Sequence, residues 1–582
     1  MAETREDRKR AMRSRDALDE LVYRSNLLGA DRSVANWGGG NTSVKTVATD
    51  FRGHLTDVMW VKGSGSDLAT MGASQFTGLR LDDIQPLIER AEMPDDEMVA
   101  WLDHCLIDRN RPRPSIETLL HAFLPFPHID HTHPDAIIAL CCADNGRSLA
   151  RELFGDRCVW VPYVRPGFTL AKLIATGVRD NPGAELVLME KHGLVTWGAT
   201  SEECYANTLA IINEAETFIA ARIVPEAVFG GPRYAALPAD ERHEILVRIL
   251  PVIRGAVSAE QRQLLAWDDA EDVLRFVGSH DASRLSQVGA ACPDHLVHTK
   301  RTPLFVDWDP DRRDVATLID ALRTGITRFK DDYVDYFARN QRPGDEVADA
   351  APRVILIPGV GMVSTGRSLA LAQVSGALYH RAIAVMRGAT ALGRFTSLDE
   401  TESYAVEYWP LELYKLSLLP AEAEFSRQVG FVTGGAGGIG SAICRQFAAE
   451  GMHVVVADIN DEGARRVAEE INEQYGAERA TAASLDVTDE AAVAAAVRAA
   501  ILAYGGVDVV VNNAGLASAS AVEETTLAEW QRNLDVLATG YFLVAREAFR
   551  LLKEQGLGGN LVFVASKNAI YAGKNAAAYS AA

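Results

Sequence analysis

Three histidines in the first third of the chain have the residue type and spacing of a metal site. His131 and His133 are two positions apart in an apolar stretch, and residues i and i+2 of a strand point to the same face, so both imidazoles can reach one ion. His192 follows the apolar run 186–189 and can supply a third nitrogen. Three histidines that leave a fourth position open are typical of catalytic zinc. We therefore predict a zinc ion bound by these three side chains.

Glu117 is the carboxylate that we expect to act beside this metal. It ends the run Pro-Ser-Ile-Glu and precedes the helical pattern 118–123. A carboxylate next to a metal can take up and return a proton. His121 lies four residues later on the same helix face, so a metal pair of Glu117 and His121 is a less favoured alternative. We expect His121 and His128 to be structural, because most buried histidines only satisfy hydrogen bonds.

Two turns rich in glycine and serine precede these residues. They are Gly-Gly-Gly-Asn-Thr-Ser at 38–43 and Lys-Gly-Ser-Gly-Ser at 62–66. In such turns backbone N–H groups and hydroxyls can converge on an anion. Each turn alone is more often a flexible loop, but together with the histidines they predict a site for a phosphate ester.

A second constellation opens the last quarter of the chain. Residues 433–440 place glycines at 434, 438 and 440 between an apolar run and an amphipathic stretch, and Asp458 ends the next apolar run. This arrangement is typical of a turn that binds a dinucleotide at a helix N-terminus. An aspartate at that position accepts from the ribose 2′-hydroxyl and repels a 2′-phosphate, so NAD is favoured over NADP.

The elements that must position these residues fall into three segments, 10–222, 223–425 and 427–582. All three alternate helical patterns with short β-branched runs, so the fold class is α/β throughout. In the third segment, apolar runs alternate with alanine-rich amphipathic stretches. That alternation predicts βαβ units and a doubly wound parallel sheet.

The middle segment contains a possible degenerate repeat of the first. Residues 186–198 line up with 354–366, and the His-x-His pair falls beside His298 and Lys300 at nearly the same spacing. Val360 replaces the third histidine, so this copy would have lost its metal. Two unrelated strand–glycine–helix units are the alternative. In either case we predict a non-catalytic α/β middle domain.

The composition excludes several classes of partner. The chain has 582 residues and a formal net charge of −21, which argues against nucleic acid or an anionic membrane surface. The sequence has no run of 18 apolar residues, and its charged start, residues 1–10, does not resemble a signal peptide. Seven cysteines without a CxxC pair are typical of reduced thiols, so we expect a cytoplasmic protein.

The N-terminal motifs resemble the class II aldolase/adducin-head family. The similarity extends over about 200 residues and rests on five short runs in order: Gly-Asn-Thr-Ser, Lys-Gly-Ser-Gly, Pro-Ser-x-Glu, His-x-His-Pro and Lys-His-Gly. The resemblance implies that the three histidines bind zinc and that Glu117 is the acid/base, which also ligates the metal when substrate is absent. It implies that the phosphate is held by Asn41, Ser64, Gly65 and Ser115.

The C-terminal motifs resemble the short-chain dehydrogenase/reductase family. The resemblance implies that Ser566 and Tyr579 are catalytic. It also implies a binding site for NAD, whose expected residues are Gly434, Gly438, Ile439, Gly440, Asp458, Asp486, Val487, Asn513, Ala514 and Gly515.

Two departures from the dehydrogenase pattern affect this expectation. Leu537 stands where the family has the asparagine of its proton relay, while Asn533 lies at another helical phase. The family's lysine would be residue 583, which lies beyond the printed sequence, and Lys567 and Lys574 are not at the motif position. On this basis we expect weak NAD binding and no oxidoreductase activity from this chain.

The order of the segments resembles the bifunctional rhamnulose-1-phosphate aldolase/alcohol dehydrogenases. The resemblance implies retro-aldol cleavage to dihydroxyacetone phosphate and lactaldehyde, with an NAD-dependent dehydrogenase that acts on the aldehyde or the alcohol. A pentulose-phosphate 4-epimerase, which would use the same metal, and a non-enzymatic adducin-like module are the alternatives. We expect a small sugar phosphate as the ligand and a homo-oligomer as the assembly.

Overall fold

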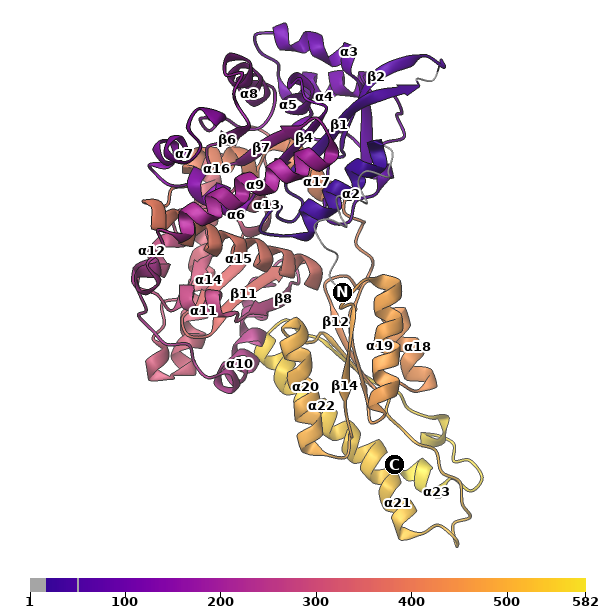
Figure 1. Cartoon of the computed structure of the whole chain (residues 1–582). Helices are drawn as coiled ribbons and strands as arrows, with labels where there is room; N and C mark the ends of the chain where they lie inside the picture. Colours follow the sequence, from indigo (N-terminus) through magenta and orange to yellow (C-terminus); the bar gives the residue numbers. More distant parts are fainter. Residues whose placement is uncertain (1–16, 50–51) are drawn as a thin grey trace. The chain divides into compact units, whose positions relative to one another are not determined.

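The computed structural model describes residues 17–49 and 52–582 (Figure 1). The charged start of the chain, and the first residues of the predicted 10–222 segment, lie outside the described residues. Contacts within the chain separate it into two compact units. Of the described residues, the first unit comprises those up to Arg233 together with Ser279–Thr302 and Ala377–Leu419, and the second comprises Tyr234–Gly278, Pro303–Gly376 and Pro420–Ala582. The middle segment is therefore shared between the two units.

The first unit is built on a seven-stranded mixed sheet. All neighbouring strands are antiparallel except β5 and β6, which are parallel. In sheet order the strands are β3 (Phe76–Arg80), β2 (Leu55–Lys62), β1 (Asn41–Thr49), β4 (His128–Thr132), β7 (Gly193–Gly198), β6 (Leu186–Met189) and β5 (Cys158–Val161).

Helices from both the N-terminal and the middle segment belong to this first unit. β6 and β7 are buried along their whole length, and the residues of β6 are continuously apolar rather than alternating, as in a sheet covered on both faces. The helices are α2 (Ala17–Ala30), α3 (Leu81–Ile84), α4 (Asp95–His104), α5 (Thr118–Phe123), α6 (Asp135–Cys141), α7 (Gly146–Phe154), α8 (Phe168–Asp180), α9 (Ser201–Ala220), α12 (Ala282–Leu285), α13 (Pro293–Thr299), α16 (Glu400–Glu407) and α17 (Pro410–Ser417).

The second unit contains two sheets. The four-stranded sheet is mixed, and the five-stranded sheet is entirely parallel. In sheet order the strands are β8 (Leu264–Asp268), β11 (Gly361–Gly366), β10 (Val354–Ile357) and β9 (Leu304–Phe305), and then β14 (Ala480–Ser484), β13 (His453–Asp458), β12 (Val429–Thr433), β15 (Val509–Asn512) and β16 (Asn560–Phe563).

The parallel sheet has helices on both faces, as the sequence predicts. Helices α18 (Gly438–Ala449) and α19 (Asp461–Tyr475) lie on one face, and α20 (Glu490–Tyr504) and α22 (Tyr541–Gln555) on the other (Figure 1). The strand order reverses between β12 and β15, which is where such sheets bind their ligands. The remaining helices of this unit are α10 (Ala239–Val257), α11 (Glu271–Val277), α14 (Val315–Asn340), α21 (Leu527–Leu534) and α23 (Ala577–Ala581), while α15 (Leu369–Leu392) runs through residues of both units.

One hydrophobic core joins the two sheets of the second unit. It contains Ile249 of α10, Ile355 of β10 and Val455 of β13. At its edge the fully buried guanidinium of Arg254 donates to Asp508, with 2.6 Å between Nη2 and Oδ2. The predicted middle and dehydrogenase segments therefore share one core in this unit.

The two mixed sheets repeat one topology. The order β4-β7-β6-β5 in the first unit corresponds to β8-β11-β10-β9 in the second. In both sheets, an antiparallel hairpin is followed by a long helix. The distance along the chain between the two copies is the same for strand and helix, because β10 starts 168 positions after β6 and α15 starts 168 positions after α9. The hairpin part of the predicted repeat is therefore present in the structure.

The part of the repeat that involves His298 and Lys300 was wrong. His298 lies on helix α13 rather than on a strand, because a proline at the first helical position starts a helix there. The strand that pairs with β11, as β4 pairs with β7, is β8, and its register puts Trp267 at the place of His131. Two residues on, Asp269 accepts from Arg242. Trp267 and Asp269 thus stand where the first copy has His131 and His133, and neither of them supplies an imidazole nitrogen for a metal.

Candidate functional site

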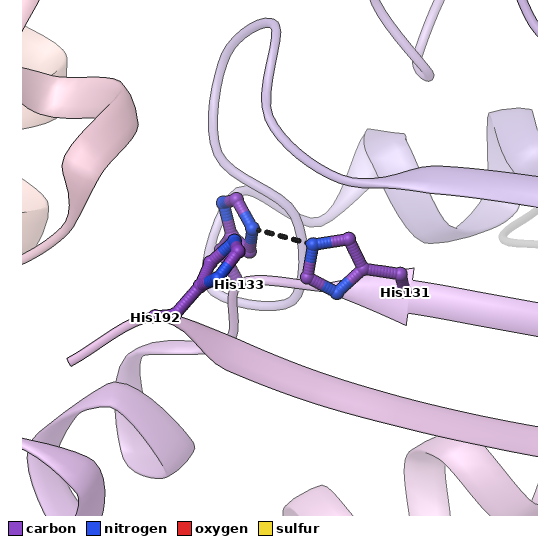
Figure 2. A group of neighbouring side chains, drawn as sticks. All are labelled: His131, His133 and His192. Carbon is purple, nitrogen blue, oxygen red and sulfur yellow. Dashed lines mark hydrogen bonds between the residues drawn. The ribbon is translucent and has the colours of Figure 1, made fainter. Parts of the chain in front are cut away.

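The structure brings the three predicted metal ligands together (Figure 2). His131 lies on β4, His133 follows that strand, and His192 lies on the turn between β6 and β7. All three side chains are buried. Their ligand atoms lie within 4.8 Å of one another, and Nε2 of His131 is 3.0 Å from Nε2 of His133.

The turn before β7 fixes the orientation of these rings. A Cβ on Gly193 would lie 2.6 Å from the Thr132 carbonyl oxygen and 2.7 Å from Cδ2 of His133, so a larger residue would push the imidazole away. His131 Nδ1 is 2.9 Å from the Leu194 carbonyl oxygen. Because that contact requires a proton on Nδ1, Nε2 is left with its lone pair toward the other histidines.

Glu117 joins the histidines at the N-terminus of α5. Its Oε1 is 3.2 Å from Nε2 of both His131 and His192, and its Oε2 accepts from Asn41 Nδ2 at 2.6 Å. Burial alone would raise the pKa of Glu117, but the two histidines outweigh it and the pKa lies well below its usual range. Glu117 is therefore an ionised carboxylate at neutral pH.

These groups fit a zinc ion. Three imidazoles form the buried donor set, and three protein nitrogens with an open fourth position are a usual catalytic zinc environment. Two Nε2 atoms at 3.0 Å from each other must share either a proton or a cation. His131, His133 and His192 are thus the residues that would hold the ion, with the carboxylate of Glu117 beside it.

The predicted phosphate residues line the pocket that opens onto this group. Asn41, Ser64, Gly65 and Ser115 all face it, together with Glu117 and His192. The Nζ of Lys62 donates to the carbonyl oxygens of Gly38 and Gly40, each at 2.9 Å, which ties the two predicted turns to each other. Asn41 has a further role that its motif did not indicate, since its amide holds Glu117 and also donates to Ser115 Oγ at 3.2 Å.

The two other histidines of this region hydrogen bond away from the metal ligands. His121 Nε2 meets Asn41 Oδ1, and its Nδ1 lies 2.8 Å from Ser43 Oγ. Burial holds the pKa of His121 well below its usual range, so it stays neutral. His128 contacts Arg24 instead. The geometry therefore gives no support to a metal pair of Glu117 and His121.

Four residues around the site were not predicted by any sequence motif. Cys292 places its Sγ 3.6 Å from His133 Nδ1. Trp409, Glu412 and Lys415 line the pocket from the segment around α17. They lie in the middle segment, in no motif, and only the packing of that segment into the first unit brings them to the pocket.

The glycine turn of the second unit is arranged as a dinucleotide site requires. Gly434 has φ +66°, and a Cβ on Gly440 would lie 2.1 Å from the Gly434 carbonyl oxygen. Asp458 accepts from the Ala436 N–H at 2.9 Å, so its carboxylate lies against the turn. Asn513 donates to the Thr433 carbonyl oxygen at 3.0 Å. The strand end, the turn and the next strand are thereby fastened together.

The predicted catalytic residues of this unit lie after β16. Ser566 accepts from the Asn568 N–H at 3.2 Å, and Tyr579 lies on α23. Asn533 is buried and donates to Ser518 Oγ and to the Glu529 carbonyl oxygen, so its amide is engaged locally. The other expected cofactor residues follow the ends of strands: Gly438 and Ile439 after β12, Asp486 and Val487 after β14, and Ala514 and Gly515 after β15.

Three family profiles match the chain, one after another. "Class II Aldolase and Adducin N-terminal domain" matches residues 19–219, "Aldolase class II, second domain" matches 244–416, and "short chain dehydrogenase" matches 428–582. Among the described residues, no helix is both long and apolar enough to cross a membrane.

Relatives extend over the whole chain or over its parts. The uncharacterized oxidoreductase YuxG of Bacillus subtilis (strain 168) is 64% identical over 574 residues, 99% of this chain and 83% of that protein. Sorbitol-6-phosphate 2-dehydrogenase of Escherichia coli (strain K12) is 39% identical over 155 residues, 27% of this chain and only 60% of that enzyme. A solved N-terminal class II aldolase domain from Thermoplasma acidophilum is 40% identical, with 35% of this chain and 94% of that chain covered and a TM-score of 0.34.

Proposed function

The chain belongs to the proteins in which class II aldolase domains are fused to a short-chain dehydrogenase domain, and from this premise we propose that it cleaves a ketose 1-phosphate by a zinc-dependent retro-aldol reaction. Rhamnulose 1-phosphate is the favoured substrate, with dihydroxyacetone phosphate and lactaldehyde as products. The dehydrogenase domain then acts on the aldehyde or the corresponding alcohol with NAD, and the protein works in the cytoplasm as a homo-oligomer in rhamnose breakdown.

One observation carries the proposal. A single ionised carboxylate, Glu117, lies 3.2 Å from two of three clustered imidazoles, at a pocket whose other lining includes two glycine- and serine-rich turns. A reaction that builds negative charge on a carbonyl oxygen and moves a proton at carbon needs both a Lewis acid and a base. Backbone N–H groups and hydroxyls can hold a phosphate ester even where the protein surface is acidic.

The residues divide this work. A zinc ion bound to the three histidines supplies the Lewis acid that stabilises the charge on the substrate oxygen. Glu117 takes up and returns the proton at its Oε1, and the amide of Asn41 holds the other carboxylate oxygen in place. Ser64, Gly65 and Ser115 orient the phosphate, so that the bond to be broken lies beside the carboxylate.

A coupled assay tests the aldolase proposal. The purified chain is incubated with rhamnulose 1-phosphate, with and without a chelator, and dihydroxyacetone phosphate is followed. We expect cleavage that the chelator abolishes and that added Zn²⁺ restores. Release of no dihydroxyacetone phosphate, together with inversion of a pentulose phosphate at C4, would assign the site to an epimerase instead.

The dehydrogenase proposal has its own measurement. Asp458 at the end of β13 is the group that favours NAD over NADP, because a 2′-phosphate would meet its carboxylate. We expect Asp458→Ala to weaken NAD binding and to improve NADP binding, measured by titration of the intrinsic fluorescence. Equal discrimination before and after the substitution would contradict the assignment of Asp458.

A further inference from the structure

The pocket of the first unit is lined in part by a helix from the middle segment. Helix α17 contributes Glu412 and Lys415, and Trp409 precedes it. These residues lie beside Ser64 and Gly65, which are the expected phosphate contacts. The profile that covers α17 describes a second aldolase domain, so one site is assembled here from two sequence segments.

The pocket lined by the expected phosphate residues contains few positively charged side chains. The lysines among its lining residues are Lys62 and Lys415, in a chain whose formal net charge is −21. Lys62 directs its ammonium to two backbone carbonyl oxygens. Lys415 has a half-buried side chain, 27% exposed, and donates to Glu412 Oε1 at 2.8 Å. Because the two residues are one turn apart, Glu412 holds the ammonium on the pocket side of the helix.

Three contacts fix α17 and its flanking residues within the first unit. The Trp409 Nε1 donates to Asp95 Oδ2 at 2.7 Å. The guanidinium of Arg113 lies 4.7 Å from the ring centre of Tyr414. Just after the helix, Leu418 packs so closely on Gly65 that a Cβ there would lie 2.7 Å from Leu418 Cδ1. The position of α17 is thus set independently of the Lys415–Glu412 pair.

We infer that Lys415 is the counter-charge for the anionic group of the substrate and that Glu412 positions its ammonium. This inference rests on the proposed function for the identity of the substrate, but its chemistry is that of any phosphate in this pocket. Neutral donors alone hold a dianion less tightly than a set that includes an ammonium, since the ammonium adds a Coulombic attraction between opposite charges. Lys415 therefore gives the site its preference for phosphorylated over unphosphorylated ketoses.

Three variants of the whole chain test this role: Lys415→Met, Lys415→Arg and, as a matched control, Lys172→Met. Lys172 belongs to the same unit and donates to the Arg90 carbonyl oxygen, and it is not among the residues that line the pocket. For Lys415→Met we expect KM for the ketose 1-phosphate to rise about 10- to 100-fold, the range expected for one hydrogen bond to a charged group. We expect kcat to change little, Lys415→Arg to recover most of the affinity, and the unphosphorylated ketose to be unaffected.

Binding of inorganic phosphate separates this inference from the proposed reaction. Its affinity is measured by calorimetry, without turnover, and should fall in Lys415→Met and persist in Lys172→Met. Unchanged phosphate affinity in Lys415→Met would overturn the inference even if the chain is an active aldolase. If the chain cleaves no ketose phosphate but Lys415→Met still lowers the affinity for inorganic phosphate, only the proposed reaction would be refuted. A fall in kcat rather than a rise in KM in Glu412→Gln would assign Glu412 to proton transfer and overturn its positioning role.

Discussion

Glu117 is distinguished from the other buried carboxylates of the first unit by its partners. Asp130 accepts from Arg24 and Thr208, which are groups that cannot exchange protons with a substrate. Glu117 is held by one amide and faces imidazoles. The Glu117 carboxylate is held at Oε2 by Asn41, while its Oε1 faces the expected metal position. A carboxylate in this arrangement is suited to move a proton.

Glu117→Gln tests this role at the level of the rate. The substitution keeps the size and the contact with Asn41 but removes the base, so we expect kcat to fall by about 10²–10⁴-fold. Metal content should stay near that of the parent chain, because the three histidines are intact. Rate and metal are measured on the same preparation by the coupled assay and by atomic absorption. Loss of the metal with the rate would show that Glu117 acts chiefly as a ligand.

His131→Ala is expected to give the opposite pattern. Its imidazole is one of three nitrogen donors, and two remaining nitrogens hold zinc poorly, so both metal content and activity should be lost together. His128→Gln is the matched control, because His128 contacts Arg24 rather than the other ligands. If His131→Ala kept a full equivalent of metal after dialysis against a chelator, these histidines would not be the zinc site.

At the scale of the elements, the sequence predicts some features of the site and misses others. The i, i+2 spacing on β4 and the apolar run of β6 are local patterns, and so they predict the histidine cluster without any knowledge of the fold. The identity of α17 as a wall of the pocket depends on contacts between residues more than 290 positions apart, such as Trp409 with Asp95, and no local pattern reports these.

The wrong alignment of the second copy has a related cause. His-Thr-Lys at the end of α13 and His-Thr-His at the end of β4 share residue types, but Pro293 begins a helix in the first case. The corresponding strand, β8, is recognisable only from its pairing with β11. The residue types at these positions differ while the strand order and the hydrogen-bonded register are the same, so the topology indicates the repeat where residue identity does not.

Lys45 supports a prediction about β1 and α5. Its ammonium donates to the carbonyl oxygens of Ala122 and Leu124 at the end of α5, and burial lowers its pKa from 10.5 to about 8. Between pH values of about 8 and 10.5, the Lys45 amine is protonated in the unfolded chain but has lost its proton in the folded chain. Lys45 therefore makes the free energy of unfolding rise with pH in this window. The rise amounts to at most about 3 kcal/mol.

Lys45→Met should remove that rise. Urea unfolding of the parent chain and the variant between pH 7.5 and 10.5 gives the difference in unfolding free energy at each pH. We expect the parent to gain on the variant as the pH increases through this window, and Lys172→Met to follow the parent. Parallel curves for the parent chain and Lys45→Met would mean that the amine is not desolvated in the folded state.

At the scale of the whole molecule, the middle segment contributes to both units. Its helices α13, α16 and α17 belong to the unit that holds the metal ligands, whereas its sheet shares a core with the dehydrogenase fold. The three consecutive segments that the sequence suggests are thus two structural units. Each unit therefore contains residues of the middle segment in addition to residues of the N-terminal or the C-terminal segment.

Asp508 is the residue through which this division can be tested. Its buried carboxylate accepts from Arg254, from Arg262 and from the Val429 N–H, and Asp508→Ala would leave the fully buried Arg254 without its partner. Removal of one partner of a buried pair costs about 3–5 kcal/mol. We therefore expect calorimetry to show a melting transition of the second unit lowered by roughly 5–15 °C.

The first unit should be spared, because none of its residues contacts this ion pair in the hydrogen bonds described. Metal content and ketose-phosphate cleavage at 25 °C should therefore match the parent chain. Glu244→Gln, which breaks an exposed ion pair with Arg498 in the same unit, is the control and should shift the transition little. If Asp508→Ala lowered the metal-dependent transition of the first unit by the same amount, the two units would unfold as one cooperative body, and the aldolase site would depend on the dehydrogenase core for its stability.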